Sequence, residues 1–132
     1  MSVAETLRDA RGSGWATVNH PLPDELVELI ADRFRVLGEP SRIKLLDRLR
    51  AGEVTVIELT AAVGTTEQNV SKHLGTLLRA GIVARRKQGS YSYYSIADEG
   101  VLALCEHVCG SLRRRLDSLQ QLVSGPSGVE LT

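Results

Sequence analysis

The sequence predicts a mainly α-helical domain that carries one small β-hairpin. Between residues 21 and 123 apolar residues recur mostly at helical spacing, whereas from 82 to 96 they alternate with polar ones around a Gly-containing turn. The chain has 132 residues, 42% of them hydrophobic, which suits a single core. We therefore expect a flexible arm over 1–20, one domain over 21–123 and a flexible tail over 124–132.

The charged residues are unevenly distributed along a chain whose formal net charge is zero. Residues 68–97 contain five basic side chains and no carboxylate. Such a region is typical of a surface that meets an anion, although a merely solvated basic face has the same composition. The first residues carry mixed charge, unlike a signal peptide. No apolar run approaches the roughly 18 residues of a membrane span, so no membrane is expected as a partner.

Two helices are expected before residue 52, after an arm in which 3–11 form a short helix and Trp15 follows in a loop. The stretch from Pro21 to Gly38 has Asp24 and Glu25 where the helix dipole favours acids, and its glycine suits the C-terminal cap. The apolar positions that share one face of this helix are Leu26, Ile30, Phe34 and Leu37. The next helix begins at Pro40, ends at Gly52 and has Ile43, Leu46 and Leu49 inside.

Residues 54–81 predict two more helices, joined by a tight turn at Gly64. The second begins with a capping box formed by Thr65 and Gln68. The expected inward positions of the pair are Val56, Leu59, Val63, Val70, Leu74, Leu77 and Leu78. The expected outward positions of the second helix are Gln68, Asn69, Ser71, Lys72 and His73. Two helices around a glycine turn, the second rich in polar side chains at its start, indicate a helix-turn-helix.

Residues 82–96 predict two short strands around the turn Gln88-Gly89-Ser90. In the second strand Tyr91 and Tyr93 share one face and Tyr94 takes the other. A long helix follows, from about Asp98 to Val123. Its apolar residues keep alternating spacings of three and four, the seam by which helices pair, and we expect it to form a homodimer interface. The interface residues expected are Leu102, Cys105, Cys109, Leu112, Leu116 and Leu119.

Three segments in this order resemble the ArsR/SmtB family of winged-helix transcriptional repressors. They read "LGEPSRIKLLDRL", "IELTAAVGTTEQNVSKHLGTLLRAGIV" and "RRKQGSYSYYSI", and the resemblance runs from about Leu26 to Leu122. It implies a winged helix-turn-helix that dimerises through its terminal helices and binds double-stranded operator DNA. It also implies release from that operator when an effector binds.

Candidate DNA-binding residues lie on the second helix of the pair and on the hairpin. Amides suit the adenine edge, bases suit guanine or phosphate, and short hydroxyls suit phosphate. The candidates are Thr66, Gln68, Asn69, Ser71, Lys72, His73, Arg86, Lys87, Gln88 and Ser90. For Ser71 and His73 the alternative is a buried role in helix packing, and Arg85 is expected to support the strand.

The terminal helix places Cys105, His107 and Cys109 close together in sequence. At roughly 100° per residue His107 points about 200° away from Cys105, so the three side chains cannot share one ion. The two thiols lie about 40° apart with Cβ atoms roughly 5–6 Å from each other, too far for an easy disulfide. They are either small apolar packing residues or a pair that binds a thiophilic ion or reacts with oxidants.

Two metal sites well known in the family are absent from this sequence. Where one has two cysteines, this chain has Thr55 and Ile57. The other keeps Asp98 but has Gly100, Ser111 and Arg114 at the remaining ligand positions. The candidate effectors are therefore As(III), Cd or Zn at Cys105 and Cys109. The alternative is a reactive sulfur, redox or non-metal signal, with structural cysteines.

An enzyme is not expected, because Cys105 and His107 diverge and no third group orients them. A protein-interaction module that uses the helical seam without DNA is the remaining competitor. Two cysteines four residues apart form no disulfide framework, which favours the reducing cytoplasm. The sequence alone names neither the operator nor the effector.

Overall fold

The computed structural model of the protein describes residues 14–124, which fall into two compact units, residues 1–39 and 40–132. The first unit contains α2 (Gly14–Thr17) and α3 (Asp24–Leu37). Trp15 therefore lies in a short helix, and its expected loop is wrong. The helix expected over 3–11 and most of the expected tail lie outside the described residues.

Helix α3 begins and ends where its charges and glycine predict. Asp24 and Glu25 occupy the first turn, and the backbone N–H of Gly38 donates to the carbonyl oxygen of Phe34 at the end. Along the apolar face Leu37 is buried, whereas Phe34 is 55% exposed. The side of α3 that carries Phe34 is thus not covered within this chain.

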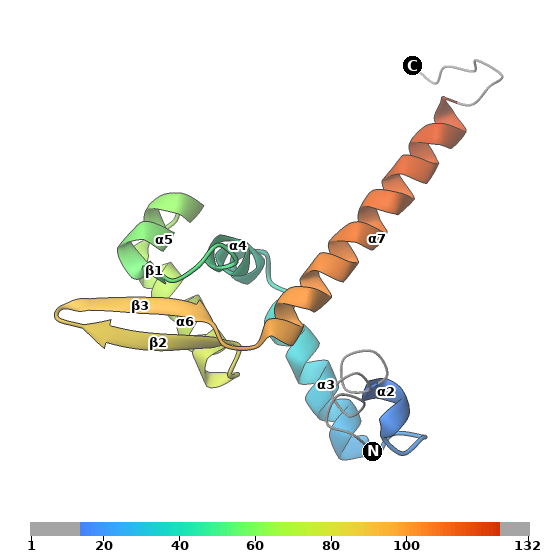
Figure 1. Ribbon diagram of the computed structural model, residues 1–132, viewed down its shortest axis with the longest axis horizontal. Helices are drawn as coiled ribbons and strands as arrows, with labels where there is room; N and C mark the ends of the chain where they lie inside the picture. Colours follow the sequence, from blue (N-terminus) through green and yellow to red (C-terminus); the bar gives the residue numbers. More distant parts are fainter. Residues whose placement is uncertain (1–13, 125–132) are drawn as a thin grey trace, which may run out of the picture. The chain divides into compact units, whose positions relative to one another are not determined.

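The second unit holds α4 (Pro40–Leu49), α5 (Val56–Val63), α6 (Glu67–Arg79) and α7 (Glu99–Val123), together with β1 (Val54–Thr55), β2 (Val83–Gln88) and β3 (Tyr91–Ile96) (Figure 1). Leucines from three helices and residues entering β2 build its core. The most deeply buried side chains are Leu45, Leu49, Leu59, Val70, Leu74, Leu77, Ile82 and Val83. Ile43 was expected inside but is 47% exposed. Leu45 occupies the inward position instead.

The helix-turn-helix is formed by α5, Gly64 and α6, as expected. Gly64 has φ 70°, a left-handed conformation that glycine adopts without strain. Each helix is capped by the threonine before it: Thr55 Oγ1 accepts from the N–H of Glu58, and Thr66 Oγ1 from the N–H of Asn69. The predicted capping box of Thr65 and Gln68 is therefore wrong by one residue, because Thr66 has the extended backbone that a cap requires.

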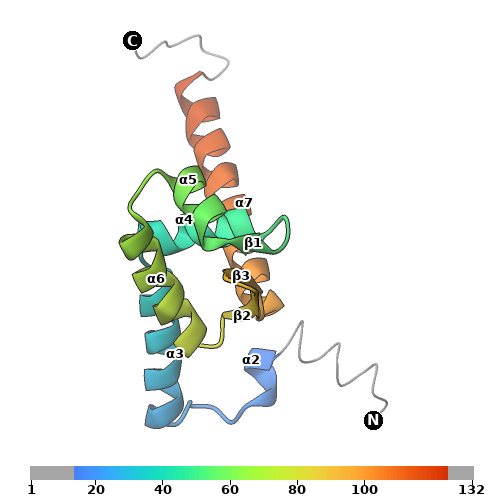
Figure 2. The same cartoon turned by 90° about the vertical axis from the view of Figure 1, so that its left-hand side faces the viewer.

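The sheet has three strands in the order β1-β3-β2, all antiparallel. The sequence predicted only the hairpin of β2 and β3, because β1 has two residues and a period cannot be read from two. The predicted tyrosine alternation is confirmed: Tyr94 is buried, and Tyr91 is 53% exposed. Figures 1 and 2 together show α6 beside one face of the hairpin.

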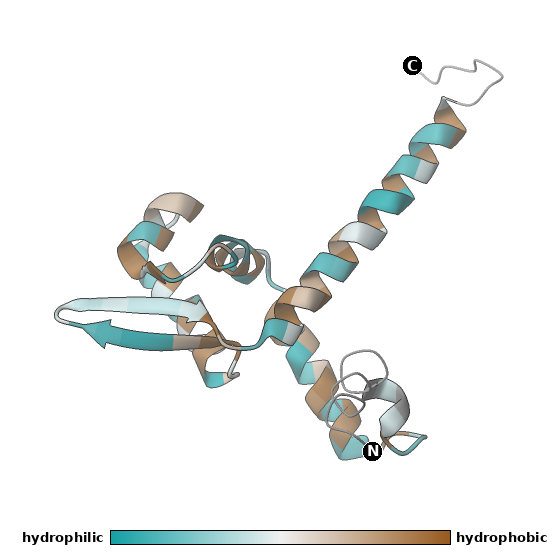
Figure 3. Cartoon of the chain, viewed as in Figure 1, coloured by the Kyte–Doolittle hydropathy of each residue, from teal (hydrophilic) through white to brown (hydrophobic). Residues whose placement is uncertain are grey.

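Helix α7 has 25 residues and begins at Asp98, whose carboxylate accepts from the N–H of Gly100. Val101 is buried, but every residue from 111 to 124 is exposed. Figure 3 shows apolar and polar bands alternating along this helix. Among the described residues no helix is both long and apolar enough to cross a bilayer.

Candidate nucleic-acid interface

Helix α6 separates its side chains into an apolar face and a polar one. Val70, Leu74 and Leu77 are almost fully buried and hold the helix against the core. Gln68, Ser71 and Lys72, three and four positions apart, are exposed on the opposite side. The buried leucines therefore fix which polar side chains face solvent, and the structure brings these three candidates together.

The first turn of α6 uses some of its polar groups internally. Thr66 is exposed, but its hydroxyl caps the helix. Asn69 is half-buried, and its side-chain nitrogen donates to Thr65 Oγ1 at 3.1 Å. The amide of Asn69 is thus held against the turn, which leaves Gln68 as the exposed amide of this helix.

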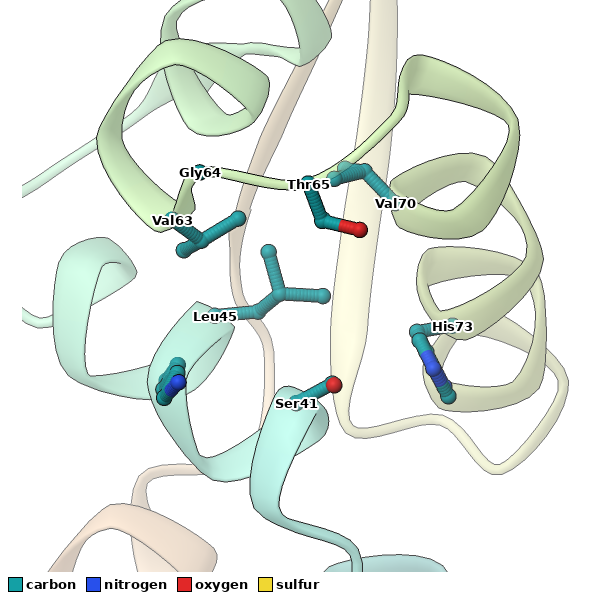
Figure 4. A pocket seen from close by; sticks show the side chains of 8 residues that line it. Ser41, Leu45, Val63, Gly64, Thr65, Val70 and His73 are labelled. Carbon is teal, nitrogen blue, oxygen red and sulfur yellow. The ribbon is translucent and has the colours of Figure 1, made fainter.

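His73 faces inward, and the expectation that it faces outward is wrong. Its side chain is 9% exposed, and Nδ1 accepts a hydrogen bond of 3.2 Å from Nε of Arg42 on α4. Position 73 follows Val70 by three residues and therefore shares the apolar face. Figure 4 shows His73 at a pocket that Ser41, Leu45 and Thr65 also line.

The hairpin of β2 and β3, called the wing from here on, carries different side chains on its two faces. Arg86 lies on one face, where its guanidinium donates to both carboxylate oxygens of Glu53 at 2.7 and 3.1 Å. It also donates to Gln88 and lies 4.6 Å from the ring centroid of Tyr93. The expected contact of Arg86 with DNA must therefore compete with a carboxylate that it already binds.

The ion pair changes the ionisation of both partners. The hydrogen bond from Arg86, with the attraction of its charge, lowers the pKa of Glu53. The same bond raises the pKa of Arg86. Because both groups are exposed to solvent, the pair orients the side chains more than it stabilises the fold.

Arg85 and Lys87 lie on the other face of the wing, since side chains alternate along a strand. Arg85 pairs in register with Tyr94, the tyrosine whose side is covered by helices. Ser90, at the tip, is exposed, as are Lys87 and Gln88. Figure 3 shows β2 as mostly hydrophilic.

The two cysteines line a groove between α4 and α7 with a volume of about 470 Å³. Cys105 is half-buried and Cys109 is exposed, and both thiols are free. Burial raises the pKa of the Cys105 thiol. Within the described residues no three His, Cys, Asp or Glu side chains gather as a metal would require. The pair alone therefore supplies two ligands.

Four features escaped the sequence prediction: strand β1, the pairing of Glu53 with Arg86, the role of Arg42 and the orientation of Arg85. Three of them join residues that are distant in sequence, and no local pattern marks them. The fourth had a signal, because period two places Arg85 on the side of Tyr94 and away from Arg86.

Comparisons with known proteins agree with this architecture. A family model described as "Helix-turn-helix domain" matches residues 37–86. The chain is 37% identical over 84 residues to the HTH-type transcriptional regulator KmtR of Mycobacterium tuberculosis, a match that covers 64% of this chain and 65% of that protein. It is 37% identical over 111 residues to the uncharacterized HTH-type transcriptional regulator Rv0081 of the same organism, over 80% of this chain and 97% of the relative.

The arsenical resistance operon repressor of Bacillus subtilis is 30% identical over 93 residues, covering 69% of this chain and 89% of the relative. Among solved structures, that of Rv0081 matches with a TM-score of 0.67 at 36% identity, over 73% of this chain and 97% of the other. The homodimeric winged helix-turn-helix DNA-binding domain of Mb0332 from Mycobacterium bovis, a possible ArsR-family transcriptional regulator, matches with a TM-score of 0.66 at 28% identity, over 76% and 95%. The chain belongs to the ArsR/SmtB family of winged helix-turn-helix transcriptional regulators.

Proposed function

We propose that this protein is a homodimeric repressor that binds double-stranded operator DNA and releases it when an effector binds near α7. The observation that carries the proposal is the polar face of α6, exposed beside a wing with basic residues. A helix of this kind fits the major groove, where each base pair presents a distinct set of donors and acceptors. The cytoplasm, where bacterial DNA lies, is then its place of action.

Gln68 is the best candidate to read a base, because its amide is exposed and two-pronged. Lys72 reaches guanine or phosphate, and Ser71 donates to phosphate. Asn69 is a weaker candidate since its amide already donates to Thr65. His73 is removed from the set by its burial.

The second protomer is proposed from the exposed apolar seam of α7. Leu112 is 55% exposed, Leu116 64% and Leu119 48%, on a helix that spans about 37 Å at 1.5 Å per residue. So long an apolar stripe is costly in water, and a second copy of the same helix covers it. The relative Mb0332 is described as homodimeric.

The effector proposed is a thiophilic ion, As(III), Cd or Zn, held by Cys105 and Cys109. Both thiols open into the same groove, and one relative is named an arsenical resistance operon repressor. Since two thiols are too few for a closed site, the remaining ligands would come from water or the second protomer. The alternative is a redox or reactive sulfur signal; the raised pKa of Cys105 disfavours it, because reactive thiols have lowered pKa values.

The test is selection of bound duplexes from a random pool, followed by affinity measurements on the selected site and on a scrambled one. Wild type should prefer the selected site, and Gln68→Ala should lose most of that preference while keeping its affinity for scrambled DNA. A protein that binds no duplex in low salt would refute the proposal.

The effector is tested on the same complex by adding As(III), Cd, Zn or a persulfide donor. We expect release of wild type and no release of the Cys105→Ser/Cys109→Ser variant. An identical response of both proteins would show that the thiols only pack. Release by persulfide alone would favour the alternative signal.

A further inference from the structure

We infer that the hollow between α6 and the wing seats a phosphate of the DNA backbone, with Arg85 as its cation, while Arg86 braces the sheet. This inference rests on the proposed function and deepens it. It assigns the two neighbouring arginines of β2 opposite roles, although they are equivalent in composition.

The hollow is built by both elements that a duplex would meet. Its polar lining includes Ser71 from α6 and Arg85, Ser90 and Ser92 from the wing, around a volume of about 410 Å³. Hydroxyls and a guanidinium are the donors that bind phosphate in protein–DNA complexes. Glu67 lines the hollow at the start of α6, so a phosphate is favoured on the side of Arg85.

The two arginines differ in what already binds them. Arg86 joins the strand edges: it contacts Glu53, which precedes β1, and Tyr93 of β3. The Arg85 guanidinium forms no ion pair with any residue in the described part of the chain. Binding a phosphate therefore costs Arg85 no existing partner, whereas Arg86 would have to give up a carboxylate.

The position of the hollow points to the DNA backbone. The major groove is about 12 Å wide, and a helix with its side chains has a diameter of about 10–12 Å, so the helix fills the groove. The flanking phosphates must then lie against whatever stands beside the helix. In this fold the wing stands beside α6, and Arg85 faces it.

The experiment compares wild type, Arg85→Ala, Arg85→Lys and Arg86→Ala on a 30-base-pair duplex of random sequence over a series of salt concentrations. We expect Arg85→Ala to weaken binding about tenfold or more and to reduce the salt slope by about 0.9 for each seat lost. Arg85→Lys should restore the slope. Arg86→Ala should keep the slope of wild type, because the positive charge that it removes is already neutralised by Glu53.

A thermal melt of each variant separates lost folding from lost binding. Equal affinity and slope for Arg85→Ala and wild type, with both folded, would overturn the inference and leave the proposed function intact. A wild type that binds no duplex would instead refute the proposed function. Loss of slope in Arg86→Ala but not in Arg85→Ala would reverse the assignment and so also overturn it.

A second arm distinguishes the DNA backbone from a free anion. Duplexes with a single neutral methylphosphonate identify the phosphate whose neutralisation weakens wild type but not Arg85→Ala, and we expect one such position on each half-site. Binding of inorganic phosphate that depends on Arg85, together with no such position, would assign the hollow to a free anion and overturn the inference.

Discussion

Nε of Arg42 donates a hydrogen bond of 3.2 Å to Nδ1 of His73 and so ties α4 to the helix that faces DNA. Because arginine only donates, Nδ1 must accept, which places the ring proton on Nε2. Helix α4 also lines the groove that holds Cys105 and Cys109. One helix therefore contacts both the thiol pair and the buried face of α6.

A double-mutant cycle measures this bond. Arg42→Met and His73→Leu should each destabilise the protein, and the cycle should yield an interaction energy of about 1 kcal/mol, the usual net worth of a hydrogen bond. Urea unfolding provides the four free energies. His73→Asn, whose amide oxygen accepts at a similar place, should retain more stability than His73→Leu. Strict additivity would mean that the two residues do not act together.

The pairing of Glu53 with Arg86 should be visible in acid. The carboxyl of Glu53, followed by its carbon-13 shift, should titrate below its model value of 4.5, and Arg86→Gln should return it towards that value. Arg85→Gln, one residue away, should leave the midpoint unchanged. Since the folded-state pKa is the lower one, the pair stabilises the fold above the unfolded pKa, and this contribution is lost as pH falls through the folded pKa. An unshifted midpoint would exclude the ion pair in solution.

The seam of α7 should decide the oligomeric state. Leu116→Asp places a charge within the apolar seam and should raise the dimer dissociation constant by at least tenfold in analytical ultracentrifugation. Leu122→Asp is the matched control, because Leu122 is 79% exposed and lies off the seam. Equal weakening by both substitutions would place the interface elsewhere.

Cys105 should alkylate slowly. In a Cys109→Ser variant the rate of reaction with iodoacetamide should have a pH midpoint above that of the same thiol in urea, since burial raises its pKa. The thiolate therefore becomes abundant only at higher pH than for an exposed cysteine. A midpoint below that of the unfolded chain would instead mark a reactive, redox-sensing thiol.

The sequence by itself determined the parts of this protein that depend on local spacing. The apolar period of three and four residues predicted α3 to α7, and Gly64 predicted the turn between α5 and α6. Alternation predicted the wing and the separate face of Tyr94. These features depend on neighbours within one or two helical turns, which a sequence displays directly.

Only the tertiary structure decided which polar side chains remain available for DNA. His73 and Gln68 look alike in sequence as polar residues of one helix, yet the first bonds to Arg42, 31 residues away, and the second stays exposed. Arg85 and Arg86 are adjacent, yet Glu53, 33 residues from Arg86, binds only the latter. The physical reason is that a side chain is free or engaged according to its partners across the fold, and chain folding alone brings those partners together.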